Sequence, residues 1–123
     1  MRAVLPVSEM LPQVAQGALA VECARDRHDV IEALRAIDDP AARAQVEAER
    51  AFLDRIGGGC DLPVGALATG AGAELTLETM LAGADGRVLI RRARSGPAAY
   101  PVGLGRAAAE ELLASGGSVL VDA

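Results

Sequence analysis

The chain has 123 residues, a net charge of −5 and 51% hydrophobic residues, which is typical of one folded domain and excludes a disordered chain. The acidic balance argues against a nucleic-acid partner, and two aromatic residues, Phe52 and Tyr100, cannot form a platform for stacking bases. No apolar run approaches the roughly 20 residues of a membrane span, and nothing at the N-terminus resembles a signal peptide, so we expect no membrane partner and a cytoplasmic protein whose Cys23 and Cys60 are reduced.

The beginning of the chain is the least regular part of the sequence. Residues 1–13 are apolar and interrupted by prolines, with no capping or turn pattern before them. Residues 16–23 form a mostly apolar run, which predicts a buried strand. Cys23 is accordingly interpreted as a packed strand residue.

A short helix is predicted after the polar residues 25–29. Asp26 or Asp29 is its expected N-cap, and the helix ends near Ile37. His28 is interpreted as a solvated surface histidine, because no nucleophile lies near it in the sequence. Three apolar residues share one face at helical spacing, namely Val30, Leu34 and Ile37.

A longer helix is predicted from Pro40 to about Ile56. Asp39 at the N-cap and proline at the first helical position are a strong start signal, and residues 57–59, all glycine, end the helix. Its apolar stripe consists of Ala44, Ala48, Phe52 and Ile56. The charged residues Glu47, Glu49 and Arg50 are interpreted as a solvated face.

The second half of the chain predicts a small sheet and a closing helix. Strands are expected at 64–69, 74–81 and 87–94, the last two joined by a hairpin turn at Asp85-Gly86. A helix follows over 103–114. Ser118 to Val121 is predicted to be a final edge strand. The fold class is therefore α+β, a small three-stranded antiparallel sheet with helices packed on one face.

Cys60 is the residue that most invites a functional reading. It follows three glycines and precedes a proline, in a connection between a helix and a strand, where nucleophiles and attachment sites tend to lie. The alternative is a small buried hydrophobic residue, and Cys60 also follows a helix C-terminus, which does not activate a thiol. From the residues alone, both interpretations stay open.

The remaining candidates are weaker. One histidine and two cysteines at scattered spacing predict no zinc site. Three arginines on the last strand are able to bind carboxylates, but charges on an edge strand also simply prevent unwanted pairing. These arginines are Arg91, Arg92 and Arg94.

Three stretches of the chain resemble segments of one known family. Residues 10–23, MLPQVAQGALAVEC, resemble the family's LPAxGQGALxxEC segment. Residues 48–53, AERAFL, and 58–66, GGCDLPVGA, resemble its AERAxL helix and its GGCxxPxGA loop. The ending, from Leu104 to Leu113, also matches the last helix of the family, so the resemblance covers nearly the whole chain from residue 10. The family is hydroxymethylbilane synthase, also called porphobilinogen deaminase.

The resemblance implies a role for the loop cysteine. In this family that cysteine holds a dipyrromethane cofactor through a thioether, which puts the role on Cys60, with Gly59 beside it. Gln16 and Gly17 match the segment that crosses between domains near the active cleft, and are implied to bind the cofactor. The implied partners are porphobilinogen, the growing pyrrole chain and the N-terminal domains of the complete enzyme.

The chain departs from the family in length and at two positions. No segment matches the two N-terminal domains, which hold the catalytic aspartate, so no catalytic residue is expected here. Residues 1–38 are predicted to be the end of the crossover with a short helix, and 39–123 the cofactor-carrying domain. Ala15 stands where the family usually has glycine, and Asp61 where it usually has glutamine or serine. The alternative function is a small non-enzymatic α+β interaction module.

Overall fold

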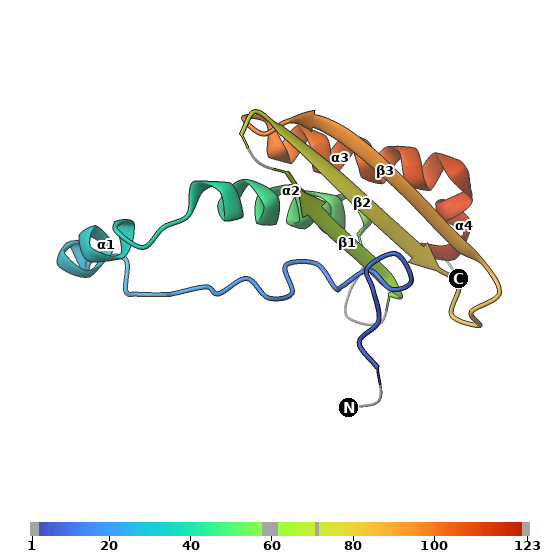
Figure 1. Cartoon of the computed structure of the whole chain (residues 1–123), viewed down its shortest axis with the longest axis horizontal. Helices are drawn as coiled ribbons and strands as arrows, with labels where there is room; N and C mark the ends of the chain where they lie inside the picture. The colour runs from blue at the N-terminus through green and yellow to red at the C-terminus, as the bar shows by residue number, and fades with distance from the viewer. Residues whose placement is uncertain (1–2, 58–61, 71, 122–123) are drawn as a thin grey trace.

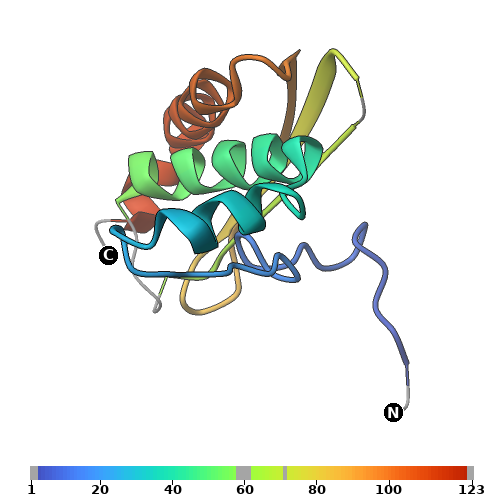
Figure 2. The ribbon, with the colours of Figure 1, turned by 90° about the vertical axis from the view of Figure 1, so that its left-hand side faces the viewer.

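The computed structural model describes residues 3–57, 62–70 and 72–121, and it has the predicted α+β architecture. Three antiparallel strands lie in the order β1-β2-β3: Val64–Thr69, Glu74–Ala82 and Leu89–Pro97 (Figure 1). The helices α2, Pro40–Ile56, and α3, Pro101–Leu112, pack on one face of this sheet (Figure 2). The predicted fold class is confirmed.

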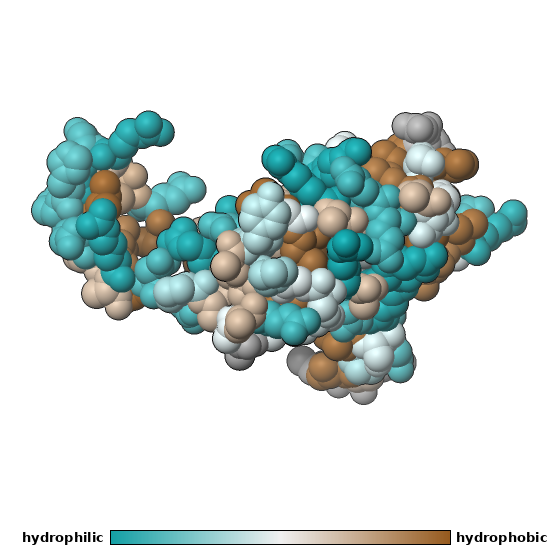
Figure 3. Space-filling view, turned by 90° about the horizontal axis from the view of Figure 1, so that it is seen from above, coloured by the Kyte–Doolittle hydropathy of each residue, from teal (hydrophilic) through white to brown (hydrophobic). Residues whose placement is uncertain are grey.

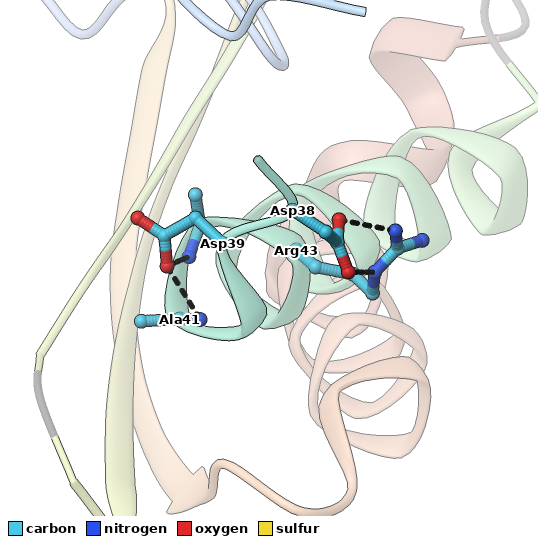
Figure 4. Close-up of polar contacts among 5 residues, drawn as sticks. Asp38, Asp39, Ala41 and Arg43 are labelled. Carbon is cyan, nitrogen blue, oxygen red and sulfur yellow. Dashed lines mark hydrogen bonds and ion pairs between the residues drawn. The ribbon is translucent and has the colours of Figure 1, made fainter. Parts of the chain in front are cut away.

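Helix α2 begins and ends at the predicted residues. The Asp39 side chain accepts hydrogen bonds from the backbone N–H groups of Ala41, at 2.9 Å, and Ala42, at 3.2 Å (Figure 4). These bonds satisfy two of the donors that a helix start leaves without partners. Gly57 ends the helix in the left-handed conformation, with φ 77°.

Alternation along the strands separates the covered face of the sheet from the open one. In β2 every second residue, from Leu75 to Leu81, is buried beneath the helices, while Thr76 and Glu78 point to the open face. Ala66 of β1 lies opposite Thr79 in the register and is likewise buried. The core joins sheet and helices through Ala48, Phe52, Ile56, Ala66, Ala68, Leu75, Leu77, Leu81, Leu104, Ala108, Ala109 and Leu112.

The two long helices cross closely because one of them carries glycine at the contact. A Cβ atom on Gly105 would lie 2.2 Å from the carbonyl oxygen of Ala48, a distance that no real side chain tolerates. Glycine at this position lets the backbones of α2 and α3 approach, so that Phe52 is fully buried between the layers.

The predicted edge strand at the end of the chain is wrong. After α3 the chain forms a π-type turn, η1, Leu113–Gly117, and then a short helix, α4, Ser118–Val121. Gly116 adopts φ 103°, which bends the chain, and Leu120 packs back against the core instead of reaching an edge of the sheet. Contact of the partly buried Leu120 with the core outweighs the β propensity of this apolar segment.

The predicted strand at 16–23 is also wrong. Gln16 and Gly17 lie in a turn and residues 18–23 belong to no strand, Leu19 is 97% exposed, and Cys23 is exposed instead of packed. They lead away from the sheet to α1, His28–Arg35, which contains no buried residue (Figure 1). The sequence pattern was apolar enough for a strand, but no strand within the described residues lies beside it. We call residues 18–38 the arm; it stands apart from the rest of the molecule (Figure 3).

The helix predicted near the start of the arm is present but shorter than expected. Helix α1 ends at Arg35, before Ile37, which is 69% exposed. Its N-cap residue is Arg27, which makes no side-chain capping bond, so neither Asp26 nor Asp29 caps it. Asp29 lies in the first turn, where a negative charge favours the helix dipole.

Candidate functional site

The connection that carries Cys60 has two fixed ends. It leaves α2 after Ile56, which is buried, and it enters β1 at Val64, which packs against the core. The carbonyl of Pro63 accepts a hydrogen bond of 3.0 Å from the N–H of Ala82, which ties the end of the connection to β2. Cys60 and Gly59 lie outside the described residues, so their predicted roles are not tested by the geometry.

Glu49, in the middle of α2, is the buried charged residue nearest in sequence to this connection. Its carboxylate accepts a hydrogen bond of 2.8 Å from the N–H of Ala68 in β1 and another of 2.6 Å from the N–H of Ala15. The residue is only 6% exposed. Two charge-assisted hydrogen bonds offset the cost of removing the carboxylate from water.

The interpretation of Glu49 as part of a solvated face is therefore wrong, although Glu47 and Arg50 are exposed as expected. The helical spacing contains the missed signal. Glu49 lies three residues before Phe52 and seven before Ile56, which places it on the buried side of α2.

A segment near the N-terminus lies along the outer edge of β1. We call residues 7–15 the strap. Leu11 is buried and its Cβ would contact any side chain placed at Gly65, while the carbonyl of Pro12 accepts a hydrogen bond of 3.2 Å from the N–H of Ala66. Together with Glu49, the strap provides acceptors for successive N–H groups on this edge of the sheet.

The strap ends in a turn that leads to the predicted crossover residues. Ala15 adopts φ 58° and Gly17 φ 86°. The Gln16 N–H donates to the carbonyl of Gln13 at 3.0 Å, and the Ala18 N–H donates to the carbonyl of Ala15 at 3.1 Å. Gln16 and Gly17 are exposed within this turn, which Glu49 contacts at Ala15, and their role toward a cofactor stays a prediction.

The three arginines of β3 do not form one cluster. Arg91 lies on the open face, where its guanidinium donates to the carbonyls of Val7, at 2.8 Å, and Ser8, at 2.6 Å, and to Glu78 at 2.8 Å. Arg92 and Arg94 point to the helical side, where they donate to Ser115 at 3.2 Å and Glu111 at 2.9 Å respectively. Alternation along the strand places Arg91 on the face opposite to the other two arginines, and each guanidinium is hydrogen-bonded to other residues of the chain.

The other candidates lie away from the connection. His28 and Cys23 are exposed on the arm, where a hydrogen bond from Arg27 lowers the pKa of Asp29. A shallow surface hollow of about 300 Å³ lies between α2 and α3, lined by Glu47, Arg50, Ala51, Asp54, Val102 and Arg106.

Two other features, a metal site and a membrane-spanning helix, are not found in the described part of the chain. Its His, Cys, Asp and Glu side chains nowhere gather into a group of three that would hold a metal ion. In the same residues, every helix is too short or too polar to cross a membrane.

Comparison with known families shows to which family the chain belongs. Residues 43–114 match the family described as "Porphobilinogen deaminase, C-terminal domain". The chain belongs to this family. The matched residues begin in α2 and continue past the end of α3, so they include the connection that carries Cys60, and the resemblance predicted from the sequence is confirmed.

Curated relatives show which part of the family's proteins this chain represents. The porphobilinogen deaminase of Roseiflexus castenholzii is 53% identical over 112 residues, which are 91% of this chain and 37% of that protein. The porphobilinogen deaminase of Brevibacillus brevis is 43% identical over 120 residues, covering 96% of this chain and 38% of that protein. The chain thus spans little more than a third of the length of these relatives, and it corresponds to their C-terminal part.

Proposed function

We propose that this chain is the cofactor-carrying domain of a hydroxymethylbilane synthase, an enzyme that condenses four porphobilinogen molecules into hydroxymethylbilane in tetrapyrrole biosynthesis. The match of residues 43–114 to the C-terminal domain of porphobilinogen deaminase supports this most strongly. The relatives from Roseiflexus and Brevibacillus, which carry the name porphobilinogen deaminase, support it over nearly the whole chain.

Within this function, Cys60 is the residue that would hold the dipyrromethane cofactor. A thiol is a soft nucleophile, suited to a stable thioether with the methylene carbon of a pyrrole. When bound, the cofactor supplies a covalent primer on which the product is assembled. The buried end of α2 at Ile56 and the paired start of β1 at Val64 would hold the base of the connection in place. Gly59, Gln16 and Gly17 are proposed to line the cofactor.

The chain alone is not expected to catalyse the condensation. General acid–base catalysis needs a positioned carboxylate or an equivalent group. Glu49, the buried carboxylate of the described residues, already accepts two backbone hydrogen bonds. We propose that the N-terminal domains of the complete enzyme supply the acid–base group and the binding of porphobilinogen. The exposed free thiol of Cys23 fits the proposed cytoplasmic location.

A chimera tests this function directly. The C-terminal part of the Roseiflexus castenholzii relative is replaced by this chain, and the purified chimera is incubated with porphobilinogen. Intact-protein mass spectrometry is expected to detect a covalent adduct that Cys60→Ser abolishes. The matched variant Cys23→Ser keeps the adduct, because that thiol lies on the arm. An unmodified wild-type chimera, or an adduct that persists in Cys60→Ser, would overturn the proposal.

A further inference from the structure

The carboxylate of Glu49 joins three elements of the chain. Helix α2 contributes the carboxylate, β1 contributes the N–H of Ala68, and the strap contributes the N–H of Ala15. Helix α2 and β1 are the two elements that flank the connection carrying Cys60. One buried carboxylate therefore contacts elements on both sides of that connection and also the turn that precedes the arm.

The turn that Glu49 holds is strained. Among the described residues, Ala15 is the one residue other than glycine with a positive φ, at 58°. Left-handed backbone is unfavourable for alanine, because its Cβ crowds the carbonyl oxygen. Such a conformation persists only where surrounding contacts impose it. At Ala15 the 2.6 Å hydrogen bond to Glu49 comes from outside the turn, and the neighbouring Val14 packs against the core.

The chemistry of the site requires a glutamate. Two N–H donors meet two carboxylate oxygens, one for each donor. A glutamine would present one oxygen and one NH₂ group, so one backbone N–H would face another donor. An aspartate is one methylene shorter and cannot span the same two donors from the same helix position.

We propose that Glu49 is a positioning residue, which sets the direction in which Gln16 and Gly17 leave the domain relative to the connection carrying Cys60. Its relevance to catalysis rests on the proposed function, while its effect on the turn does not. A residue that merely stabilises the fold would slow the hydrogen exchange of the turn and core amides equally. A positioning residue protects the turn more than the core.

Amide hydrogen exchange of the whole chain separates these two roles. In Glu49→Gln we expect exchange at Ala15 and Gln16 to accelerate at least about tenfold, as loss of a hydrogen bond to a charged group predicts. Exchange at Leu77 and Leu112 in the core is expected to change less than about threefold. The control is Glu47→Gln, the same chemical change on the exposed side of α2. Equal acceleration at all four amides, or none at Ala15, would overturn the proposal.

A second variant covers the case in which Glu49→Gln unfolds the chain. Adding Ala15→Gly removes the strain at φ 58° and is expected to restore folding. Exchange at Gln16 is still expected to stay fast, because the turn has lost its hydrogen bond to Glu49. Restoration of both folding and slow exchange at Gln16 would mean that the turn orients itself, and would overturn the proposal.

The chimera provides the catalytic readout. Glu49→Gln is expected to keep the adduct on Cys60 and to lower kcat at least about tenfold with KM nearly unchanged, because small misplacements of reacting groups slow the chemical step. An unchanged kcat would contradict the catalytic part of the proposal. Absence of the adduct in the wild-type chimera would instead refute the proposed function, and would leave the exchange result at Ala15 standing.

Discussion

The arm and the body, by which we mean the three-stranded sheet with α2, α3 and α4, use the same sequence pattern with opposite results. Helix α1 in the arm and helix α2 in the body both carry an apolar face, but α1 has no buried residue whereas α2 buries Phe52 and Ile56 completely or nearly so. Helical spacing of apolar residues thus indicates that a face is suited to burial. It does not indicate that the covering element lies in the same chain.

Truncation of a large side chain in each region gives the largest contrast. Phe52→Ala is expected to lower the free energy of unfolding by about 3–5 kcal/mol, because it leaves a cavity beneath two helices. Leu19→Ala, in the arm, is expected to change it by less than about 0.5 kcal/mol, since Leu19 is 97% exposed. Urea denaturation measures both. Equal losses would mean that Leu19 is buried in solution.

The next largest change in the free energy of unfolding is expected where α2 and α3 pack closely against each other. Gly105→Ala is expected to lower the free energy of unfolding by about 1–3 kcal/mol, because its Cβ would meet the carbonyl of Ala48 at 2.2 Å and force α2 and α3 apart. Arg106→Ala, the exposed neighbour, serves as the control, with little change expected. A neutral Gly105→Ala in thermal or urea unfolding would show that the helices separate freely.

A substitution in the turn between the strap and the arm is expected to have a smaller effect on the free energy of unfolding, and of opposite sign. Ala15→Gly is expected to raise the free energy of unfolding by about 0.5–1 kcal/mol, because relief at φ 58° exceeds the entropy that glycine loses on folding. Ala18→Gly, where φ is not positive, is expected to bring no gain. A destabilising Ala15→Gly would mean that the turn is not strained.

The smallest effect is electrostatic and lies in the arm. Arg27 donates to Asp29 at 2.8 Å and lowers the pKa of that carboxyl. The stabilisation is thus present above the pKa of Asp29 in the unfolded chain, and is lost as pH falls through the lower pKa of the folded chain. In Arg27→Met, an NMR titration is expected to give a higher pKa for Asp29, while Arg25→Met leaves it unchanged. Identical midpoints in all three proteins would exclude the contact.

Local signals predicted most of the body. Asp39 and Pro40 fixed the start of α2, Gly57 its end, and the initial alternation of apolar and polar residues identified β2, because each of these depends on neighbouring residues alone. The ends of the chain required knowledge of distant contacts. Leu120 became helical because it packs on the core, and Leu19 is unpaired because no neighbouring strand lies beside it within the described residues.

The residues of the candidate site likewise fall into those that the sequence identified and those that only the structure revealed. Cys60 was singled out by its glycine-rich surroundings and by resemblance, which needed no structure. The roles of Glu49 and Arg91 depend on backbone groups far away in the sequence, at Ala15, Ala68, Val7 and Ser8. Such partners leave no mark in composition or spacing, since every residue has a backbone carbonyl and every residue except proline has a backbone N–H.

The covered edge of β1 has a consequence for association between copies of the chain. The N–H groups of Ala66 and Ala68 point away from β2, and in an uncovered sheet they would invite a strand from another molecule. Here the carbonyl of Pro12 and the carboxylate of Glu49 already occupy both donors. Before a strand from another molecule can pair with this edge, it has to displace the strap and leave the buried carboxylate of Glu49 without its hydrogen-bond donor. The contacts that cover the edge therefore also oppose aggregation.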